Sequence, residues 1–290
     1  MMELRGVYTA MVTPFRNGAV DFSRLTEMVE MQISGGVAGL VPVGTTGESP
    51  TLTVKEHLKV IDVVIKQVAG RCQVIAGTGA NSTAEAIEFT LEAKKSGADA
   101  TLQVTPYYNK PTQEGLYRHF SAVADTAGLP VVLYNVPGRT GVPINVETIV
   151  RLSRNTNIVA VKEAAGSVDR VSQILDACNI TVLSGDDSLT IPMMSVGATG
   201  IISVASNLIP AEVCAMVEAF ARGNIDKAMQ LHRRYYPVYR DLFLETNPIP
   251  IKAAMAMKGL LEEEYRLPLC QMSEANRAKL QATLEKCGIL

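Results

Sequence analysis

A lysine at the end of a short apolar segment is the first candidate for chemistry in this sequence. Residues 158–161 (Ile-Val-Ala-Val) predict a buried strand, and Lys162 follows it directly. Lysine is almost never fully buried without a partner, so the ordinary interpretation is a side chain that reaches solvent or pairs with Glu163. The alternative is a nucleophile, because a lysine amine forms Schiff bases with carbonyl compounds.

Similar apolar segments recur along the chain, separated by amphipathic helical patterns. We predict strands at residues 7–12, 40–43, 73–76, 101–105, 131–135, 158–162, 181–184 and 200–204. Eight parallel strands with helical connections predict an α/β fold, a (β/α)8 TIM barrel, with a doubly wound open sheet as the alternative. In a barrel the active site lies at the carboxyl ends of the strands, so Lys162 would face that mouth.

Helix signals support the alternation. Two pairs of a hydroxyl residue and a glutamate three positions later, at 53–56 and 82–85, predict capping boxes. The first is followed by an apolar stripe with helical spacing: Leu58, Ile61, Ile65 and Val68.

Beyond residue 223 the strand pattern stops, and helical spacing continues, for example at 251–261 and 274–287. We predict a catalytic barrel over residues 1–223 and a short C-terminal helical region over residues 224–290. This helical region would pack on the barrel or serve an oligomer contact.

Charge and cysteine content narrow the functional classes. The 290 residues carry 27 Lys and Arg against 29 Asp and Glu, which argues against nucleic acid or an anionic membrane as the partner. The chain has no apolar run near the roughly 18 residues that span a bilayer, and its first residues do not resemble a signal peptide. Five scattered cysteines and only three histidines predict buried reduced thiols in a cytoplasmic protein, without a metal site.

Hydroxyls, phenols and one lysine gather at the predicted strand ends. These ends are residues 13–14, 44–49, 77–79, 105–109, 134–135, 162–163, 185–187 and 202–203. Such a set suits covalent amine catalysis with proton relays. Taken singly, each side chain also has an ordinary interpretation, such as a packed tyrosine or a solvated arginine.

Two glycine-rich segments resemble nucleotide-binding motifs but depart from them. Residues 77–82 (Gly-Thr-Gly-Ala-Asn-Ser) end in serine where a dinucleotide fingerprint has glycine or alanine, and they lie in the third unit rather than the first. Residues 44–49 (Gly-Thr-Thr-Gly-Glu-Ser) lack the Gly-Lys-Ser/Thr ending of a phosphate loop. This second segment is either an ordinary turn or a nest of N–H groups and hydroxyls that holds a carboxylate.

Five motifs together resemble one family. They are Gly-Thr-Thr-Gly-Glu-Ser at 44–49, Val-Thr-Pro-Tyr-Tyr-Asn at 104–109, Tyr-Asn-Val-Pro-Gly-Arg-Thr-Gly at 134–141, Val-Lys-Glu-Ala at 161–164 and Leu-Ser-Gly-Asp-Asp at 183–187. The chain resembles the dihydrodipicolinate synthases, from Val7 through Asn-Pro-Ile-Pro-Ile-Lys at 247–252 to the C-terminus.

The resemblance implies a reaction without a separate cofactor. Lys162 would form an imine with pyruvate, and the derived enamine would attack L-aspartate 4-semialdehyde. Tyr134 would donate and accept protons, and Thr45 would link it to Tyr108 of a neighbouring subunit in a homotetramer built as a dimer of dimers.

The same resemblance implies the substrate contacts. Thr46 and the backbone of its loop would hold the pyruvate carboxylate, and the carbonyl of Ile202 would lie close to the imine. Gly185 would be a further substrate-binding residue. Arg139, a fixed fork of donors, would bind the carboxylate of the semialdehyde.

Other functions compete with this interpretation. N-acetylneuraminate lyases and 2-keto-3-deoxy-acid aldolases would share Lys162 and Tyr134, but the lyases that resemble this chain have a small or apolar residue in place of Arg139. A non-catalytic small-molecule sensor would not need a lysine beside two phenols.

A second site is implied for L-lysine as a feedback inhibitor. Its residues would be Ser49, His57, Asn81, Glu85 and Tyr107. Pro50 and Val54 depart from the lysine-sensitive pattern, so we expect an altered strength of inhibition. The ordinary interpretation is a helix cap at Glu85 and a solvated His57.

Overall fold

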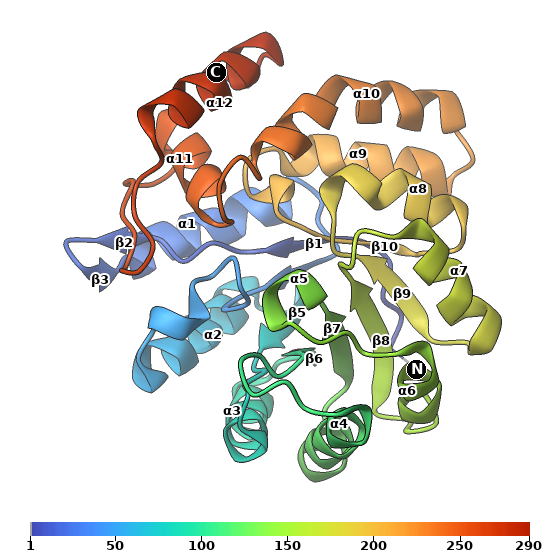
Figure 1. The fold of residues 1–290 in the computed structure, drawn as a ribbon. Helices are drawn as coiled ribbons and strands as arrows, with labels where there is room; N and C mark the ends of the chain where they lie inside the picture. Colours follow the sequence, from blue (N-terminus) through green and yellow to red (C-terminus); the bar gives the residue numbers. More distant parts are fainter. Residues whose placement is uncertain (1) are drawn as a thin grey trace.

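A closed barrel of parallel strands forms the centre of the computed structural model, which describes residues 2–290 (Figure 1). Around the barrel the order is β1 (Gly6–Ala10), β10 (Gly200–Ser203), β9 (Thr181–Ser184), β8 (Ile158–Glu163), β7 (Val131–Asn135), β6 (Ala100–Val104), β5 (Gln73–Gly77) and β4 (Gly39–Val41). The predicted strands and the (β/α)8 barrel are confirmed. The open-sheet alternative is wrong, because β1 pairs with both β4 and β10.

Side chains that point into the barrel make a core of their own. They include Tyr8, Val41, Ile75, Leu102, Val132, Tyr134, Leu183 and Ile202. Glycine is needed where the largest of them lies, because a Cβ on Gly39 would come 2.6 Å from the Tyr8 ring. The filled lumen leaves the carboxyl ends of the strands as the place for a site.

Helices surround the barrel and bury an outer apolar layer against it (Figure 1). They are α1 (Phe22–Ser34), α2 (Val54–Val68), α3 (Thr83–Ser96), α4 (Gln113–Ala127), α6 (Val146–Leu152), α7 (Val168–Ala177), α8 (Thr190–Ser195) and α9 (Pro210–Ala221).

The predicted helix signals are partly confirmed. Thr53 and Glu56 form a complete capping box at the start of α2. At α3 only half of the box forms: Ser82 accepts from the Glu85 N–H, and the Glu85 side chain does not return the bond. The buried face of α2 is also rotated from the predicted stripe and consists of His57, Val60, Ile61, Val64 and Val68.

Several short elements were not predicted, because two to four residues carry too little periodicity to be recognised. They are the hairpin β2 (Phe15–Arg16) and β3 (Ala19–Val20), the helix α5 (Pro137–Thr140), and the 3-10 turns η1 (Ser49–Thr51), η2 (Asp187–Leu189) and η3 (Ala205–Asn207). Helix α5 matters for the site, because it carries Arg139.

The C-terminal region folds as α10 (Ile225–Asp241), α11 (Ile249–Met257) and α12 (Glu274–Lys286), which lie to one side of the barrel (Figure 1). Val238, Met255 and Leu280 belong to the same hydrophobic core as the outer layer of the barrel. The boundary at residue 223 stays a prediction.

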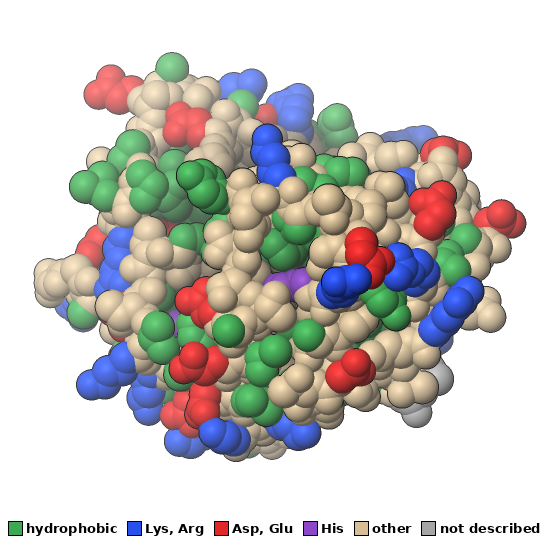
Figure 2. Space-filling view, turned by 60° about the horizontal axis from the view of Figure 1, so that its bottom comes forward, with side chains coloured by type: hydrophobic (Ala, Val, Ile, Leu, Met, Phe, Trp, Pro, Cys, Tyr) green, Lys and Arg blue, Asp and Glu red, His purple; other side chains and the backbone are tan. Residues whose placement is uncertain are grey.

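The surface and the cysteines complete the description. Figure 2 shows basic and acidic side chains interspersed over one face of the molecule. No helix within residues 2–290 is both long and apolar enough to cross a membrane. All five cysteines are free, but Cys270 is exposed and only Cys287 is buried, so the prediction of buried thiols is wrong for the others.

Candidate active site

Lys162 lies at the carboxyl end of β8 with its side chain inside the barrel. Lys162 is only 5% exposed, and its Nζ lies 4.2 Å from the centre of the Tyr134 ring. Tyr134 is its register partner on β7, so the two side chains share one face of adjacent strands. The ordinary interpretation of a solvated lysine is therefore wrong.

Glu163 does not pair with Lys162, because the next residue on a strand points to the opposite face. Its buried carboxylate accepts from Asn135 Nδ2 at 2.9 Å, from the Ala165 N–H at 2.9 Å and from Arg170 Nε at 3.0 Å. Burial raises the pKa of Glu163, and the bonds from Asn135 and Arg170 oppose that rise. This cluster fixes the ends of β7 and β8 and thereby the direction of Lys162.

Strand β9 leaves room beside the lysine. A Cβ on Gly185 would lie 3.1 Å from Lys162 Cε and 2.5 Å from Ala164 Cβ, so the close approach requires glycine. Next along the chain, Asp186 is half-buried; burial raises the pKa of its carboxyl, and the charge of Lys162 opposes this. Ile202, on β10, is fully buried in the barrel core.

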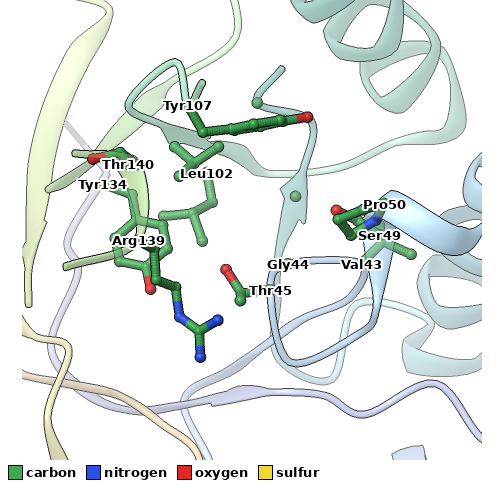
Figure 3. Close-up of a pocket in the computed structure, with 13 residues that line it drawn as sticks. Val43, Gly44, Thr45, Ser49, Pro50, Leu102, Tyr107, Tyr134, Arg139 and Thr140 are labelled. Carbon is green, nitrogen blue, oxygen red and sulfur yellow. The ribbon is translucent and has the colours of Figure 1, made fainter. Parts of the chain in front are cut away.

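A cavity of about 210 Å³ opens at the mouth (Figure 3). Its lining includes Gly44, Thr45, Ser49, Leu102, Tyr107, Tyr134, Arg139 and Thr140. Thr45 follows β4, Tyr134 lies on β7 and Arg139 lies in α5 directly after β7. The three side chains point toward one another in Figure 3. Lys162 does not line this cavity itself, but the ring it contacts does.

The loop at 44–49 is held by the C-terminal region. Thr46 is buried, and its Oγ1 accepts from Asn247 Nδ2 at 2.9 Å. Glu48 adopts a left-handed backbone conformation with φ of 56°, which is uncommon for a residue other than glycine. The Glu48 carboxylate binds Lys252 Nζ at 2.5 Å, and both side chains are fully buried.

Lys252 and Asn247 were not assigned a role from the sequence. Their motif at 247–252 was recognised, but nothing local in it shows which loop it would contact. Burial lowers the pKa of Lys252, and the Glu48 carboxylate opposes this. The Phe15 ring lies 4.3 Å from Lys252 Nζ and covers the other side of the pair.

Arg139 and Tyr108 are both exposed, whereas Lys162, Tyr134 and Thr46 are buried. Arg139 Nη2 donates to the backbone carbonyl of Asn247 at 3.0 Å, so the guanidinium is anchored rather than free. Tyr108 is 91% exposed and has a φ of 71°. Within a single chain the structure brings Thr45 and Tyr134 to the cavity and leaves Tyr108 outside its lining.

The residues predicted for lysine border a second, smaller cavity of about 150 Å³. Ser49, His57, Glu85 and Tyr107 line it, and Asn81 lies outside its lining but donates from Nδ2 to the Tyr107 carbonyl at 3.3 Å. The two cavities share Ser49, Pro50, Gly79 and Tyr107.

Burial shifts the pKa of two side chains in this second cavity. His57 is not solvated as expected: it is buried, with Nε2 2.9 Å from the Gly77 carbonyl, and burial lowers its pKa. Burial raises the pKa of Tyr107, and the charge of Glu85 raises it further. The smaller cavity therefore presents a carboxylate, a protonated phenol and a neutral imidazole.

Within residues 2–290 the structure contains no group of three or more His, Cys, Asp or Glu residues able to hold a metal ion. The fold and the site define a (β/α)8 barrel that presents a buried lysine and a tyrosine next to its mouth. The arrangement suits amine chemistry on a small carbonyl compound.

Comparison with known proteins agrees with this class. The Dihydrodipicolinate synthetase family matches residues 3–287, and the chain belongs to that family of enzymes. A 4-hydroxy-tetrahydrodipicolinate synthase of Methanococcus vannielii is 54% identical over 288 residues, which cover 99% of this chain and 100% of the relative. The resemblance read from the five motifs is confirmed.

Two solved structures are close in fold as well. A dihydrodipicolinate synthase of Acinetobacter baumannii complexed with pyruvate has a TM-score of 0.97 and 45% identity, covering 99% of this chain and 100% of that chain. The protein of Cyanidioschyzon merolae with lysine bound has a TM-score of 0.96 and 42% identity, covering 99% of both chains.

The buried pair of Lys252 and Glu48 gives a prediction about stability. Lys252→Met leaves the Glu48 carboxylate buried without its partner and should lower the free energy of unfolding by about 3–5 kcal/mol, measured by urea denaturation. Adding Glu48→Gln should recover most of that loss, because the charge is then gone. Lys66→Met, at an exposed pair with Asp62, is the matched control and should change little. Equal effects of Lys252→Met and the control would contradict a structural role for the buried pair.

Proposed function

We propose that the protein is a 4-hydroxy-tetrahydrodipicolinate synthase, which condenses pyruvate with L-aspartate 4-semialdehyde. The observation that carries this proposal is the buried Lys162 amine beside the Tyr134 ring, next to a cavity that also presents Thr45 and Arg139. Family membership and the name of the Methanococcus vannielii relative support it. Five free cysteines and a biosynthetic role favour the cytoplasm.

The reaction begins at Lys162. Its neutral amine attacks the ketone carbon of pyruvate, and loss of water gives an imine. A methyl proton then leaves, and the resulting enamine carbon attacks the aldehyde of the semialdehyde, which forms the imine again. The amino group of that substrate next attacks the imine carbon, which closes the ring and releases the lysine amine.

Tyr134 moves the protons in this scheme. A phenol within reach of the carbinolamine can return a proton as water leaves and take one back later. Thr45 stands between Tyr134 and the second phenol, Tyr108, which we assign to a neighbouring subunit. The exposure of Tyr108 supports an assembly in which it reaches across a dimer interface, and we propose a homotetramer built as a dimer of dimers.

We assign the substrate contacts to residues around the same site. Thr46 and the N–H groups of its loop hold the pyruvate carboxylate, and Gly185 gives the imine room beside Lys162 Cε. The Ile202 carbonyl lies on β10, the neighbour of β9 in the barrel. Arg139, at the rim of the cavity, binds the carboxylate of the semialdehyde with its planar fork.

We also propose that L-lysine binds in the smaller cavity and inhibits. The support is the lining by Glu85, Tyr107 and Ser49, together with the lysine bound to the Cyanidioschyzon merolae relative. Because Tyr107 adjoins Tyr108 and lines both cavities, lysine binding can change the active site through one residue.

Arg139→Ala tests the second substrate. The wild type should convert pyruvate with L-aspartate 4-semialdehyde and should not cleave N-acetylneuraminate or 2-keto-3-deoxy acids. In Arg139→Ala, kcat/KM for the semialdehyde should fall. The fall should correspond to a loss of about 2–3 kcal/mol of transition-state binding free energy, as expected for a lost charge-assisted bidentate contact. Pyruvate trapping by borohydride should stay intact. Equal loss of trapping and turnover would show that Arg139 serves the fold instead.

Complementation tests the shared site. Tyr108→Phe and Lys162→Ala chains, each inactive alone, should regain up to about a quarter of wild-type activity when mixed, because random exchange gives half mixed dimers with one intact site each. Subunit exchange is verified by native mass spectrometry. Complete exchange without recovery would place Tyr108 outside the partner's site.

Calorimetry tests the lysine site. L-lysine should bind the wild type, and Glu85→Ala should weaken binding by about tenfold or more through loss of an ion pair with the ligand ammonium. Glu88→Ala, on the same helix, is the matched control and should bind as the wild type does. Absence of binding to the wild type at millimolar lysine would mean that these residues serve only the fold.

A further inference from the structure

Asn247 lies between the two side chains that we assign to the substrate carboxylates. Its Nδ2 donates to Thr46 Oγ1 at 2.9 Å, and its backbone carbonyl accepts from Arg139 Nη2 at 3.0 Å. Thr46 follows β4, Arg139 is in α5 and Asn247 precedes α11. One residue of the C-terminal region therefore contacts both groups.

The amide of Asn247 is only half satisfied. The residue is 6% exposed, and among residues 2–290 its buried Oδ1 has no hydrogen-bond partner. Buried amides generally pair both of their polar atoms, and leaving one unpaired costs stability. A side chain that served packing alone would gain by being apolar, so the amide is explained best by what its donor does at Thr46.

We propose that Asn247 is a positioning residue that sets the direction of the Thr46 hydroxyl proton. A hydroxyl has one proton and two lone pairs. Because the Asn247 amide occupies a lone pair of Oγ1, the proton of Thr46 cannot point toward the amide and is free to donate to a carboxylate. This inference rests on the proposed role of Thr46 in binding pyruvate.

The same residue fixes the distance between the two carboxylate sites. Arg139 is anchored to the backbone of Asn247 and not to its side chain, so substitutions at this position keep that bond. Changes of the side chain should therefore affect pyruvate much more than the semialdehyde. A residue that merely supported the fold would affect both substrates alike.

Two substitutions separate positioning from packing. Asn247→Ala removes the amide but leaves the Thr46 proton free. Asn247→Asp is isosteric, yet its oxygen in place of the amide nitrogen accepts from Thr46 and turns the proton away from the substrate. If Asn247 positions the Thr46 proton, Asn247→Asp should weaken pyruvate trapping more than Asn247→Ala does. If Asn247 only fills space, Asn247→Asp should have the smaller effect, because Asn247→Ala leaves a cavity.

The measurement is the pyruvate concentration that half-saturates borohydride trapping at Lys162, in the full-length protein. It should rise about tenfold in Asn247→Ala and about thirtyfold in Asn247→Asp, as a lost hydrogen bond to a charged group would give. KM for the semialdehyde should change less than threefold. Tyr265→Phe, which removes a 2.9 Å bond to the Ile249 carbonyl in the same region, is the control and should leave trapping unchanged.

The Thr46→Val background removes the hydroxyl proton and leaves only the effect of charge. Without the Thr46 hydroxyl, Asn247→Asp and Asn247→Ala should trap pyruvate equally, beyond the loss due to Thr46→Val itself. If Asn247→Asp still traps pyruvate more weakly than Asn247→Ala in the Thr46→Val background, charge repulsion and not proton direction is the cause, and the inference is wrong. A smaller loss of trapping in Asn247→Asp than in Asn247→Ala, with Thr46 present, would also overturn the inference.

Folding and the proposed function are controlled separately. Thermal unfolding shows which variants fold. If Asn247→Ala does not fold, the effect of Asn247→Asp on pyruvate trapping, compared between the wild-type and Thr46→Val backgrounds, still tests the inference. If the wild type does not trap pyruvate at Lys162, the proposed function fails. Normal trapping by the wild type with unchanged trapping in both Asn247 variants would defeat this inference alone.

Discussion

The buried ion pair between Lys252 and Glu48 holds together the two parts of the chain that make the site. Desolvating both charges is costly, and the 2.5 Å contact offsets that cost only while both partners are present. The pair keeps Glu48 in its left-handed conformation and so fixes the loop that presents Thr45 and Thr46. The C-terminal region is thus part of the site's construction and not only a cover for the barrel.

Two buried lysines in one protein show how surroundings decide the role. Lys252 has a carboxylate in direct contact and an aromatic ring beside it, so its amine is engaged in the fold. Lys162 is almost equally buried, but within residues 2–290 it makes no ion pair and contacts the Tyr134 ring. A buried amine without a direct anionic partner is the one that remains available to a carbonyl carbon.

The sequence predicted the barrel well, because eight apolar segments alternating with helical patterns admit few architectures. It also placed Lys162 and Tyr134 together, since side chains at the ends of neighbouring parallel strands meet. It did not predict that His57 is buried or that Asn247 and Lys252 contact the loop at 44–49. The contacts of Asn247 and Lys252 join positions about two hundred residues apart, and no local periodicity encodes them.

Labelling with pyruvate and borohydride, followed by peptide mapping, tests whether Lys162 is the nucleophile. One labelled residue is expected, Lys162, with Lys252 unlabelled despite its similar burial. Lys162→Arg should take up no label, because a guanidinium stays protonated and forms no imine. Label on Lys252 or on any other lysine, or label that persists in Lys162→Arg, would show that Lys162 is not the nucleophile.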